Sequence, residues 1–397
     1  MTGDLFTARD SSRIDSDSLV NGGPFYQAMR SLGLAERRRV FNRIVVWLGV
    51  TWLPLVLLCL AKGTAFGLKV NIPLFLDYSV YGRFLVALPL LIASEVILDP
   101  FLRRVVSTFN SSGIIHETDL PVYRGALEKI VRLRDSNRVE FLIAIFAFFP
   151  FFLVVADYEW ISSTVTTWHG TASARLSPAG WWFVLVSTPF LRFLMLRWIW
   201  RYALWCFLLR CISRLNLELL ATHPDRLAGL GFMVLAQQQF GILATALGSV
   251  LAGQFANEII HFGLAPRGVR TEAVVFVAIA LLVIFLPLTL FSFKLFEARR
   301  DGLLRYGRVA RIVANGFDTK WVATPGSSPD AMIGTQDPSS LIDYISSYDV
   351  IHDTRVIPIT RRAVLSVAAQ AAAPFALIWY LATPIDDLIV EILKRLL

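Results

Sequence analysis

Apolar residues in this chain gather into long runs, which are separated by shorter stretches rich in polar and basic residues. The apolar runs cover residues 44–61, 81–98, 139–156, 180–212, 227–256, 273–296 and 363–382. Each approaches or exceeds the ~20 residues that a helix needs to cross a bilayer. Because a helix satisfies its own backbone hydrogen bonds in lipid, the pattern predicts an all-α fold. We expect a polytopic transmembrane bundle of about seven spans within residues 44–383.

The basic residues predict how this bundle is oriented. Arginine and lysine are concentrated before residue 44 and in the connections 101–138 and 297–362, and the other connections carry few. Since basic loops stay on the cytoplasmic side, we expect a cytoplasmic N-terminal tail over residues 1–43, disordered up to residue 22, and a C-terminus on the outer face. An apolar stripe in residues 384–397 predicts a final amphipathic helix.

The fourth apolar run is longer than a bilayer is thick. Residues 180–212 make about 50 Å of helix, whereas the hydrocarbon core measures ~30 Å. We therefore expect a cytoplasmic helical extension, in which helices at residues 122–131 and 303–313 cover the surplus.

Composition limits the class of protein. Of the 397 residues, 55% are hydrophobic and 17% are charged, against about 25% charged in soluble domains. The net charge of +8 comes from residues beside the apolar runs, so the expected partner is the lipid bilayer and not nucleic acid. Three cysteines and five scattered histidines show no ligand spacing, so we expect no disulfide framework, metal site or cofactor.

Ionisable residues inside a span are costly and therefore mark candidate functional positions. Glu95 in the second span and Arg192 in the fourth lie at similar depth, and we predict an ion pair or a shared polar network between them. The alternative is that each side chain extends to the inner interface. Arg197 and Arg201 share a helix face, about 140° from Arg192, and are expected to anchor the inner surface.

The fifth span carries three consecutive glutamines, Gln237, Gln238 and Gln239. Three successive positions cover about 200° of a helix, so at least one side chain faces another helix or a wet cavity. One interpretation is a water-lined pathway or ligand cavity, and the other is hydrogen bonding between helices. Gln370 in the seventh span is grouped with them as a pore or network residue.

The fifth span also carries small residues at every fourth position. Ala244, Gly248, Ala252 and Ala256 form a face that permits close helix contact. The contact lies either within the chain or in a homo-oligomer formed through span 5 or through the alanine-rich span 7.

An elbow, THPDRLAGLGF at residues 222–232, joins the fourth and fifth spans. In the structural interpretation Asp225 caps the fifth span, Pro224 opens its first turn, Arg226 reaches lipid phosphate, and Gly229 and Gly231 allow another backbone to approach. In the functional interpretation His223, Asp225 and Arg226 form a proton- or anion-sensing site at a helix N-terminus.

Three stretches carry a resemblance to a known group of proteins. They are LRWIWRYALWCFLLRCISRLNLELLATHPDRLAGLGF, RFLVALPLLIASEVILD and SLIDYISSYDVIHDTRVIPI. The chain resembles uncharacterised bacterial polytopic inner-membrane proteins that share the THPDRxxGLGF elbow. The resemblance implies an inner-membrane location but no established activity. With the orientation that the basic residues predict, the N-terminus is then cytoplasmic and the C-terminus periplasmic.

The sequence shows no P-loop, dinucleotide fingerprint, HExxH motif or nucleophile elbow, so an enzyme is not favoured. Three hypotheses follow. The first is a channel or transport-like pore based on the glutamines and the buried charges. The second is a membrane scaffold or signalling partner that recruits a protein through its cytoplasmic loops. The third is an enzyme that acts on a lipid-linked substrate at the elbow.

Overall fold

The computed structural model describes residues 18–67, 69–149, 166–171, 175–323 and 335–382. The regular secondary structure of these residues is helical apart from a small antiparallel ribbon of two strands, β1 (Gly170–Thr171) and β2 (Arg175–Leu176). Five helices are long and apolar enough to cross a membrane, namely Val40–Lys62, Tyr78–Ser111, Pro178–Ile212, Gly231–Phe262 and Gly268–Val322. The protein is accordingly an integral membrane protein built from helices.

Several of these long helices consist of consecutive segments, in which α-helix alternates with short turns of 3-10 or π helix that are labelled η. In chain order the helical segments are α2 (Pro24–Ser31), η1 (Arg37–Arg39), α3 (Val40–Thr51), α4 (Leu53–Lys62), η2 (Leu74–Leu76), α5 (Tyr78–Val80), η3 (Tyr81–Ala87), α6 (Leu88–Ser111), η4 (Glu117–Asp119), α7 (Leu120–Arg134), α8 (Asn137–Phe148), α10 (Pro178–Trp182), η5 (Phe183–Ser187), α11 (Thr188–Ile212), α12 (Gly231–Gln238), α13 (Gly241–Phe262), α14 (Pro266–Phe285), η6 (Leu286–Phe291), α15 (Ser292–Phe317), η7 (Asp318–Val322), α17 (Asp337–His352) and α18 (Arg361–Ala382).

Five of the predicted spans coincide with the five long apolar helices. The predicted third span begins within α8, and the predicted seventh lies within α18. Residues 150–156 and the predicted amphipathic helix at 384–397 fall outside the described residues. Seven crossings, and the side of the membrane on which each connection lies, therefore remain predictions.

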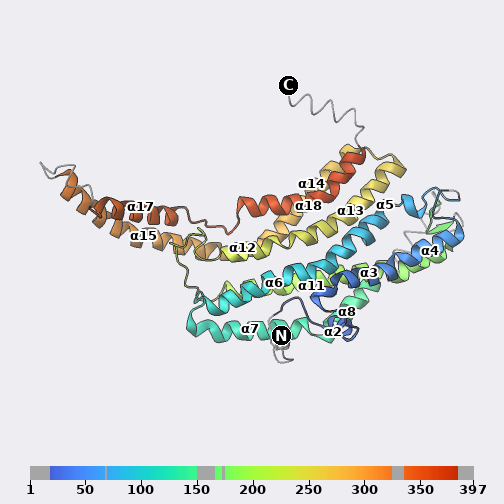
Figure 1. Ribbon diagram of the computed structural model, residues 1–397, viewed down its shortest axis with the longest axis horizontal. Helices are drawn as coiled ribbons and strands as arrows, with labels where there is room; N and C mark the ends of the chain where they lie inside the picture. The colour runs from blue at the N-terminus through green and yellow to red at the C-terminus, as the bar shows by residue number, and fades with distance from the viewer. Residues whose placement is uncertain (1–17, 68, 150–165, 172–174, 324–334, 383–397) are drawn as a thin grey trace, which may run out of the picture.

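α6 is central to the packing. Together with η3 it contacts α12 and α13 on one side and α3 and α11 on the other (Figure 1). Two glycines allow the helix formed by α5 and η3 to cross α13 with the backbones in close contact. A Cβ on Gly82 would lie 2.2 Å from the carbonyl oxygen of Ser249, and one on Gly253 would lie 2.7 Å from that of Tyr78. Larger residues at these positions would force α13 away from the helix formed by α5 and η3.

The small-residue face of α13 packs within the chain, against α18. A Cβ on Gly248 would lie 3.2 Å from the carbonyl oxygen of Ala371, and Ala244, Ala252 and Ala256 are buried. The Thr245 hydroxyl donates to the carbonyl of Gln370 at 2.8 Å. The predicted span 5 and span 7 faces therefore contact each other in this structure, which leaves less of either surface for a second copy.

The two helices expected to cover α11 behave differently. α7 packs along α11 and fixes itself to α6 through the Tyr123 hydroxyl, which donates to the carbonyl of Val106 at 3.0 Å. α15 instead packs against α17, and the two helices extend together beyond the bundle at one end (Figure 1). The expectation that residues 303–313 cover α11 was therefore wrong.

The N-terminal segment also differs from its prediction as a disordered tail up to residue 22. Ser18 and Val20 are fully buried, and Leu19 is 2% exposed. Ser18 donates to the Asp99 carboxylate, and its carbonyl accepts from Arg134. Apolar side chains and paired polar groups thus hold residues 18–22 inside the bundle, although a stretch this short and polar gives no sign of order in the sequence.

Candidate functional site

The elbow is folded around one carboxylate. Asp225 Oδ1 accepts hydrogen bonds from the backbone N–H groups of Leu227 at 2.8 Å and Gly229 at 3.1 Å, and Oδ2 accepts from Gly231 at 2.8 Å. Gly231 is the first residue of α12, so Asp225 caps this helix from six residues before its start. Pro224 lies before the helix and not in its first turn, which corrects the predicted start of the span.

The same carboxylate holds a strained backbone. Arg226, Ala228 and Gly229 have φ values of 57°, 52° and 95°, a region that residues with a side chain rarely adopt. Burial acts to raise the pKa of Asp225, but hydrogen bonds from Leu227, Gly231 and Gly229 hold that pKa below its ordinary value. Asp225 therefore stays ionised and keeps the loop closed at neutral pH.

The elbow is also tied to the chain that follows α17. The backbone N–H of Arg355 donates to the carbonyl of Arg226 at 2.9 Å, and the Thr354 hydroxyl donates to the carbonyl of Ala221 at 3.2 Å. Arg226, predicted to reach lipid phosphate, lies 3.2 Å from the Asp353 carboxylate. These contacts fix the elbow against the approach to α18.

A cavity of about 1000 Å³ lies against the elbow, between the end of α6, the start of α12 and the start of α18. His223, Asp225, Gly229 and Gly231 of the elbow line it together with Gln238. The further lining residues are Thr108, Ser112, Gly113, Ile114, Glu218, Leu220, Leu227, Ala228, Phe232, Val234, Leu235, Thr360 and Arg362. Two features that the sequence analysis kept separate, the elbow and one mid-span glutamine, thus share one site.

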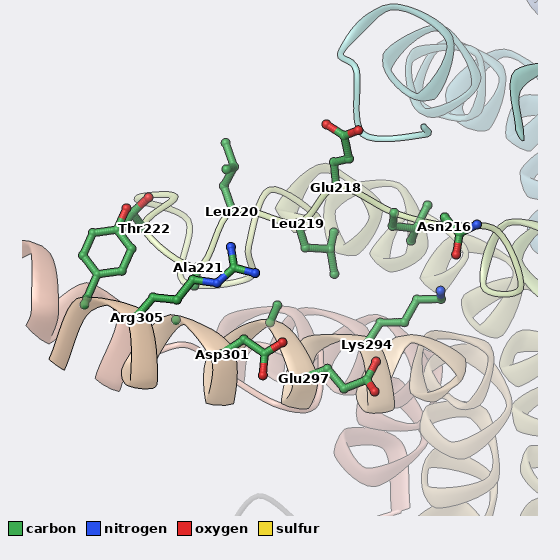
Figure 2. Close-up of a pocket in the computed structure, with 14 residues that line it drawn as sticks. Asn216, Glu218, Leu219, Leu220, Ala221, Thr222, Lys294, Glu297, Asp301 and Arg305 are labelled. Carbon is green, nitrogen blue, oxygen red and sulfur yellow. The ribbon is translucent and has the colours of Figure 1, made fainter. Parts of the chain in front are cut away.

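A second, smaller groove of about 440 Å³ lies on the other side of residues 216–222. Figure 2 shows Lys294, Glu297, Asp301 and Arg305 along α15 on one wall of this groove, with residues 216–222 crossing above them. Glu218 points away from α15 in this view. Residues 216–222 therefore form a partition between a groove of mixed charge and the elbow cavity.

The three glutamines have different surroundings. Gln237 is fully buried, and its Oε1 accepts from the indole N–H of Trp205 at 2.7 Å. Its amide nitrogen donates to the carbonyl of Ile284 and lies 3.3 Å from the Tyr202 hydroxyl. Gln238 lines the cavity, and Gln239 donates to the carbonyl of Leu235 in its own helix at 3.3 Å. Gln237 therefore forms hydrogen bonds between helices, whereas Gln238 lines the cavity.

Gln370 lies away from this cavity, against the start of α13. Its amide nitrogen is 3.2 Å from the Ser366 hydroxyl, and a Cβ on Gly241 would come within 2.8 Å of its Oε1. The structure therefore places Gln370 in a close helix contact and does not bring it together with Gln238.

Glu95 is the centre of a buried charge cluster. Its Oε1 lies 2.9 Å from Arg197 and 2.8 Å from Arg201, and its Oε2 lies 2.7 Å from Arg43. All four residues are at most 5% exposed. The predicted partner, Arg192, is not among these residues, so the predicted Glu95–Arg192 ion pair was wrong.

The helix geometry explains this correction. Arg197 and Arg201 are four residues apart and face α6 together, while Arg192 points about 140° away. The similar depth of Glu95 and Arg192 in the membrane was therefore not enough to predict which arginine pairs with Glu95. Arg197 and Arg201, expected at the inner surface, are buried because one carboxylate accepts from both.

The N-terminal segment completes this cluster. Arg197 donates to the carbonyl of Gly22 at 3.0 Å and lies 3.3 Å from Glu140, whose carboxylate also accepts from the backbone N–H of Phe25 at 3.0 Å. Arg43 and Glu140 are not among the residues predicted from the sequence. Both lie near predicted span ends, where a charged side chain is ordinarily solvated, so the sequence carried no signal for their burial.

A second buried carboxylate, Asp77, lies at the other end of the bundle. It accepts from Trp168 Nε1 at 2.9 Å, from Asn257 Nδ2 at 2.7 Å and from the Ser79 hydroxyl at 2.6 Å. His169 stacks on Trp168 with 3.6 Å between ring centroids. Burial lowers the pKa of His169 to about 4, against the opposing effect of Asp77. Asp77 thereby joins α5, the connection that holds Trp168 and helix α13, which are far apart in the sequence.

These sites contain hydrogen-bond acceptors and donors, and two open spaces border residues 216–222. Within the described residues, no group of three His, Cys, Asp or Glu side chains is placed to hold a metal ion. Comparison with protein-family models, with curated proteins and with solved structures finds no match for this chain.

Proposed function

We propose that this integral membrane protein is transport-like and takes a ligand into the elbow cavity at its arginine-rich end. The observation that carries the proposal is the cavity of about 1000 Å³, in which the elbow and Gln238 line one space. Gln238 lies seven residues into α12, so the cavity follows that helix for about 10 Å. Ligand pockets measure ~300–1000 Å³, and this size suits a molecule better than a dehydrated ion.

The surroundings of the glutamines support a ligand path on one side of α12. A pore past all three would need their amides to face water, yet the Gln237 amide bonds to Trp205 and to the carbonyl of Ile284. Gln238 is the glutamine that lines an open space. We therefore assign the ligand path to the Gln238 side of α12.

A blocking variant tests this proposal. Thr108 lines the cavity, while Ser107, its neighbour on α6, is exposed and does not. Liposomes containing the protein are assayed for movement of potassium, glycerol 3-phosphate and a phospholipid with a fluorescent tail. We expect the wild type and Ser107→Trp to move at least one probe and Thr108→Trp to move none. Equal movement by both variants, or none by the wild type, would contradict the proposal.

A second candidate function, a scaffold that pairs with itself, is favoured by the hairpin of α15 and α17. Leu304, Ile312 and Ile342 are 60%, 71% and 62% exposed on it. α15 is basic, with exposed Arg305, Arg308 and Arg311, whereas α17 is acidic, with exposed Asp343 and Asp349. A surface that carries both signs and apolar residues is complementary to a second copy of itself about a two-fold axis.

The oligomeric state tests the scaffold. We expect native mass spectrometry of the purified chain in detergent to show a dimer that Ile312→Glu converts to a monomer. Ser111→Glu, at an exposed position of α6 outside the hairpin, should leave the dimer intact. A monomeric wild type would remove this candidate.

A further inference from the structure

The elbow cavity is lined by ionisable side chains and by apolar ones. Its ionisable residues form a polar part that lies before the helices or at their starts, with Glu218 and His223 ahead of α12 and Arg362 in the first turn of α18. Three of its apolar residues, Phe232, Val234 and Leu235, lie inside α12, and three more, Ile114, Leu220 and Leu227, lie in the connections beside it. A ligand that fills this space therefore needs a polar head and an apolar remainder.

The charges in the polar part are of both signs. Two carboxylates, Glu218 and Asp225, face the cavity together with one guanidinium, that of Arg362. Asp225 already accepts three backbone hydrogen bonds, and its Oδ1 lies 2.9 Å from His223 Nδ1. Glu218 is the more open carboxylate, with a side chain 62% exposed and directed away from the α15 groove (Figure 2). A purely anionic head would meet both carboxylates, and a purely cationic head would meet Arg362.

From this arrangement we infer that the cavity binds a zwitterionic amphiphile of the phosphoethanolamine class, such as an ethanolamine phospholipid. The phosphate pairs with Arg362, because a guanidinium matches phosphate oxygens. The ammonium pairs with Glu218. The acyl chains lie along Phe232, Val234 and Leu235, where α12 enters the apolar part of the bundle. This inference rests on the proposed function, to which it adds the class of ligand.

Calorimetric titration of the full chain in detergent tests the inference. The probes are short-chain phosphatidylethanolamine, short-chain phosphatidylglycerol and the tail-free headgroup glycerophosphoethanolamine. We expect the ethanolamine lipid to bind about tenfold more tightly than either of the others, since each comparison removes one charged or apolar contact. Equal binding of the two lipids would overturn the assignment of the ammonium, and equally tight binding of the tail-free headgroup would overturn that of the lipid.

Matched variants locate the site. Arg362→Gln should weaken both lipids about tenfold, while Arg361→Gln, at an exposed neighbour that does not line the cavity, should change neither. Glu218→Gln should remove the preference for ethanolamine and leave phosphatidylglycerol unchanged. If Arg361→Gln weakens binding as much as Arg362→Gln, binding is a general surface effect and the site assignment fails.

The blocking variant separates this inference from the proposed function. Thr108→Trp should abolish lipid binding, and binding that persists would place the lipid elsewhere. If Thr108→Trp stops probe movement but the two lipids bind equally to the wild type, only the ligand class is wrong. If the ethanolamine lipid binds as expected but no probe moves, only the transport proposal is wrong.

Discussion

Asp225 accepts a hydrogen bond from the backbone N–H of Gly231, six residues further along the chain, at 2.8 Å. This contact links the elbow directly to the first residue of α12 and fixes one wall of the cavity. An Asp that caps a helix ordinarily does so from the adjacent position. Here the capping residue lies at the far side of a loop, so the loop and the helix start form one unit.

Replacing Asp225 by Asn is expected to loosen this unit. One amide oxygen remains to accept hydrogen bonds, so at least one buried backbone N–H loses its partner, at a cost of about 1–3 kcal/mol. Thermal unfolding in detergent measures the loss. Asp353→Asn removes the exposed Arg226–Asp353 pair, which should cost at most about 1 kcal/mol. Equal losses for both variants would contradict the role given to Asp225.

The pH dependence of stability should report on His169. Its pKa is lowered to about 4 in the folded protein, against ~6.5 in the unfolded chain. Between these values the unfolded state binds more protons, so stability falls as pH falls from ~6.5 to ~4, by at most about 1.4 kcal/mol per pH unit. Unfolding temperatures from pH 7.5 to 4.5 measure this slope. His169→Gln should flatten it, whereas His116→Gln, at an exposed site, should not.

The charge cluster predicts a large difference between two substitutions. Glu95→Gln leaves Arg43, Arg197 and Arg201 buried without their shared counter-charge, which should cost about 3–5 kcal/mol. Arg192→Gln removes an arginine outside the cluster and should cost less than about 1 kcal/mol. Thermal unfolding of both variants compares them. A larger effect at Arg192 than at Glu95 would restore the pairing that the sequence suggested.

Substitutions of Gln237 and Gln238 should affect different properties, stability in the first case and ligand binding in the second. Gln237→Leu leaves the buried indole N–H of Trp205 unpaired, which should lower stability by about 1–3 kcal/mol. Gln238→Leu should change ligand binding in the cavity and leave stability within about 1 kcal/mol. Unfolding temperature and lipid titration of each variant measure the two effects. A loss of binding without a loss of stability in Gln237→Leu would reverse the assignment.

The close contact of Gly82 with α13 can be tested by adding a methyl group there and, as a control, at Gly49 in α3. Gly82→Ala places a Cβ 2.2 Å from the carbonyl oxygen of Ser249, so the backbones must separate, and we expect a loss of about 1–3 kcal/mol. Gly49, in α3, has nothing within 4 Å of its added Cβ. Gly49→Ala should be neutral or stabilising by up to about 1 kcal/mol. Thermal unfolding of both variants decides, and equal behaviour would argue against close contact at Gly82.

The sequence by itself determined the apolar helices, because only uninterrupted runs of apolar residues can replace water by lipid around a helix. It also identified the elbow, since Pro, Gly and Asp at residues 222–232 cannot continue an apolar span. The spacing of Gly248 and its neighbours indicated a close helix contact, because small residues leave room for another backbone.

The tertiary structure alone decided which polar groups meet. Glu95 pairs with Arg43, Arg197 and Arg201 and not with Arg192, because the partner depends on how helices are rotated about their axes and a depth count contains no rotation. It also decided that Gln237 is bonded while Gln238 faces a cavity, and that residues 18–20 are buried. Each outcome depends on segments far apart in the chain that approach one another only after the helices pack.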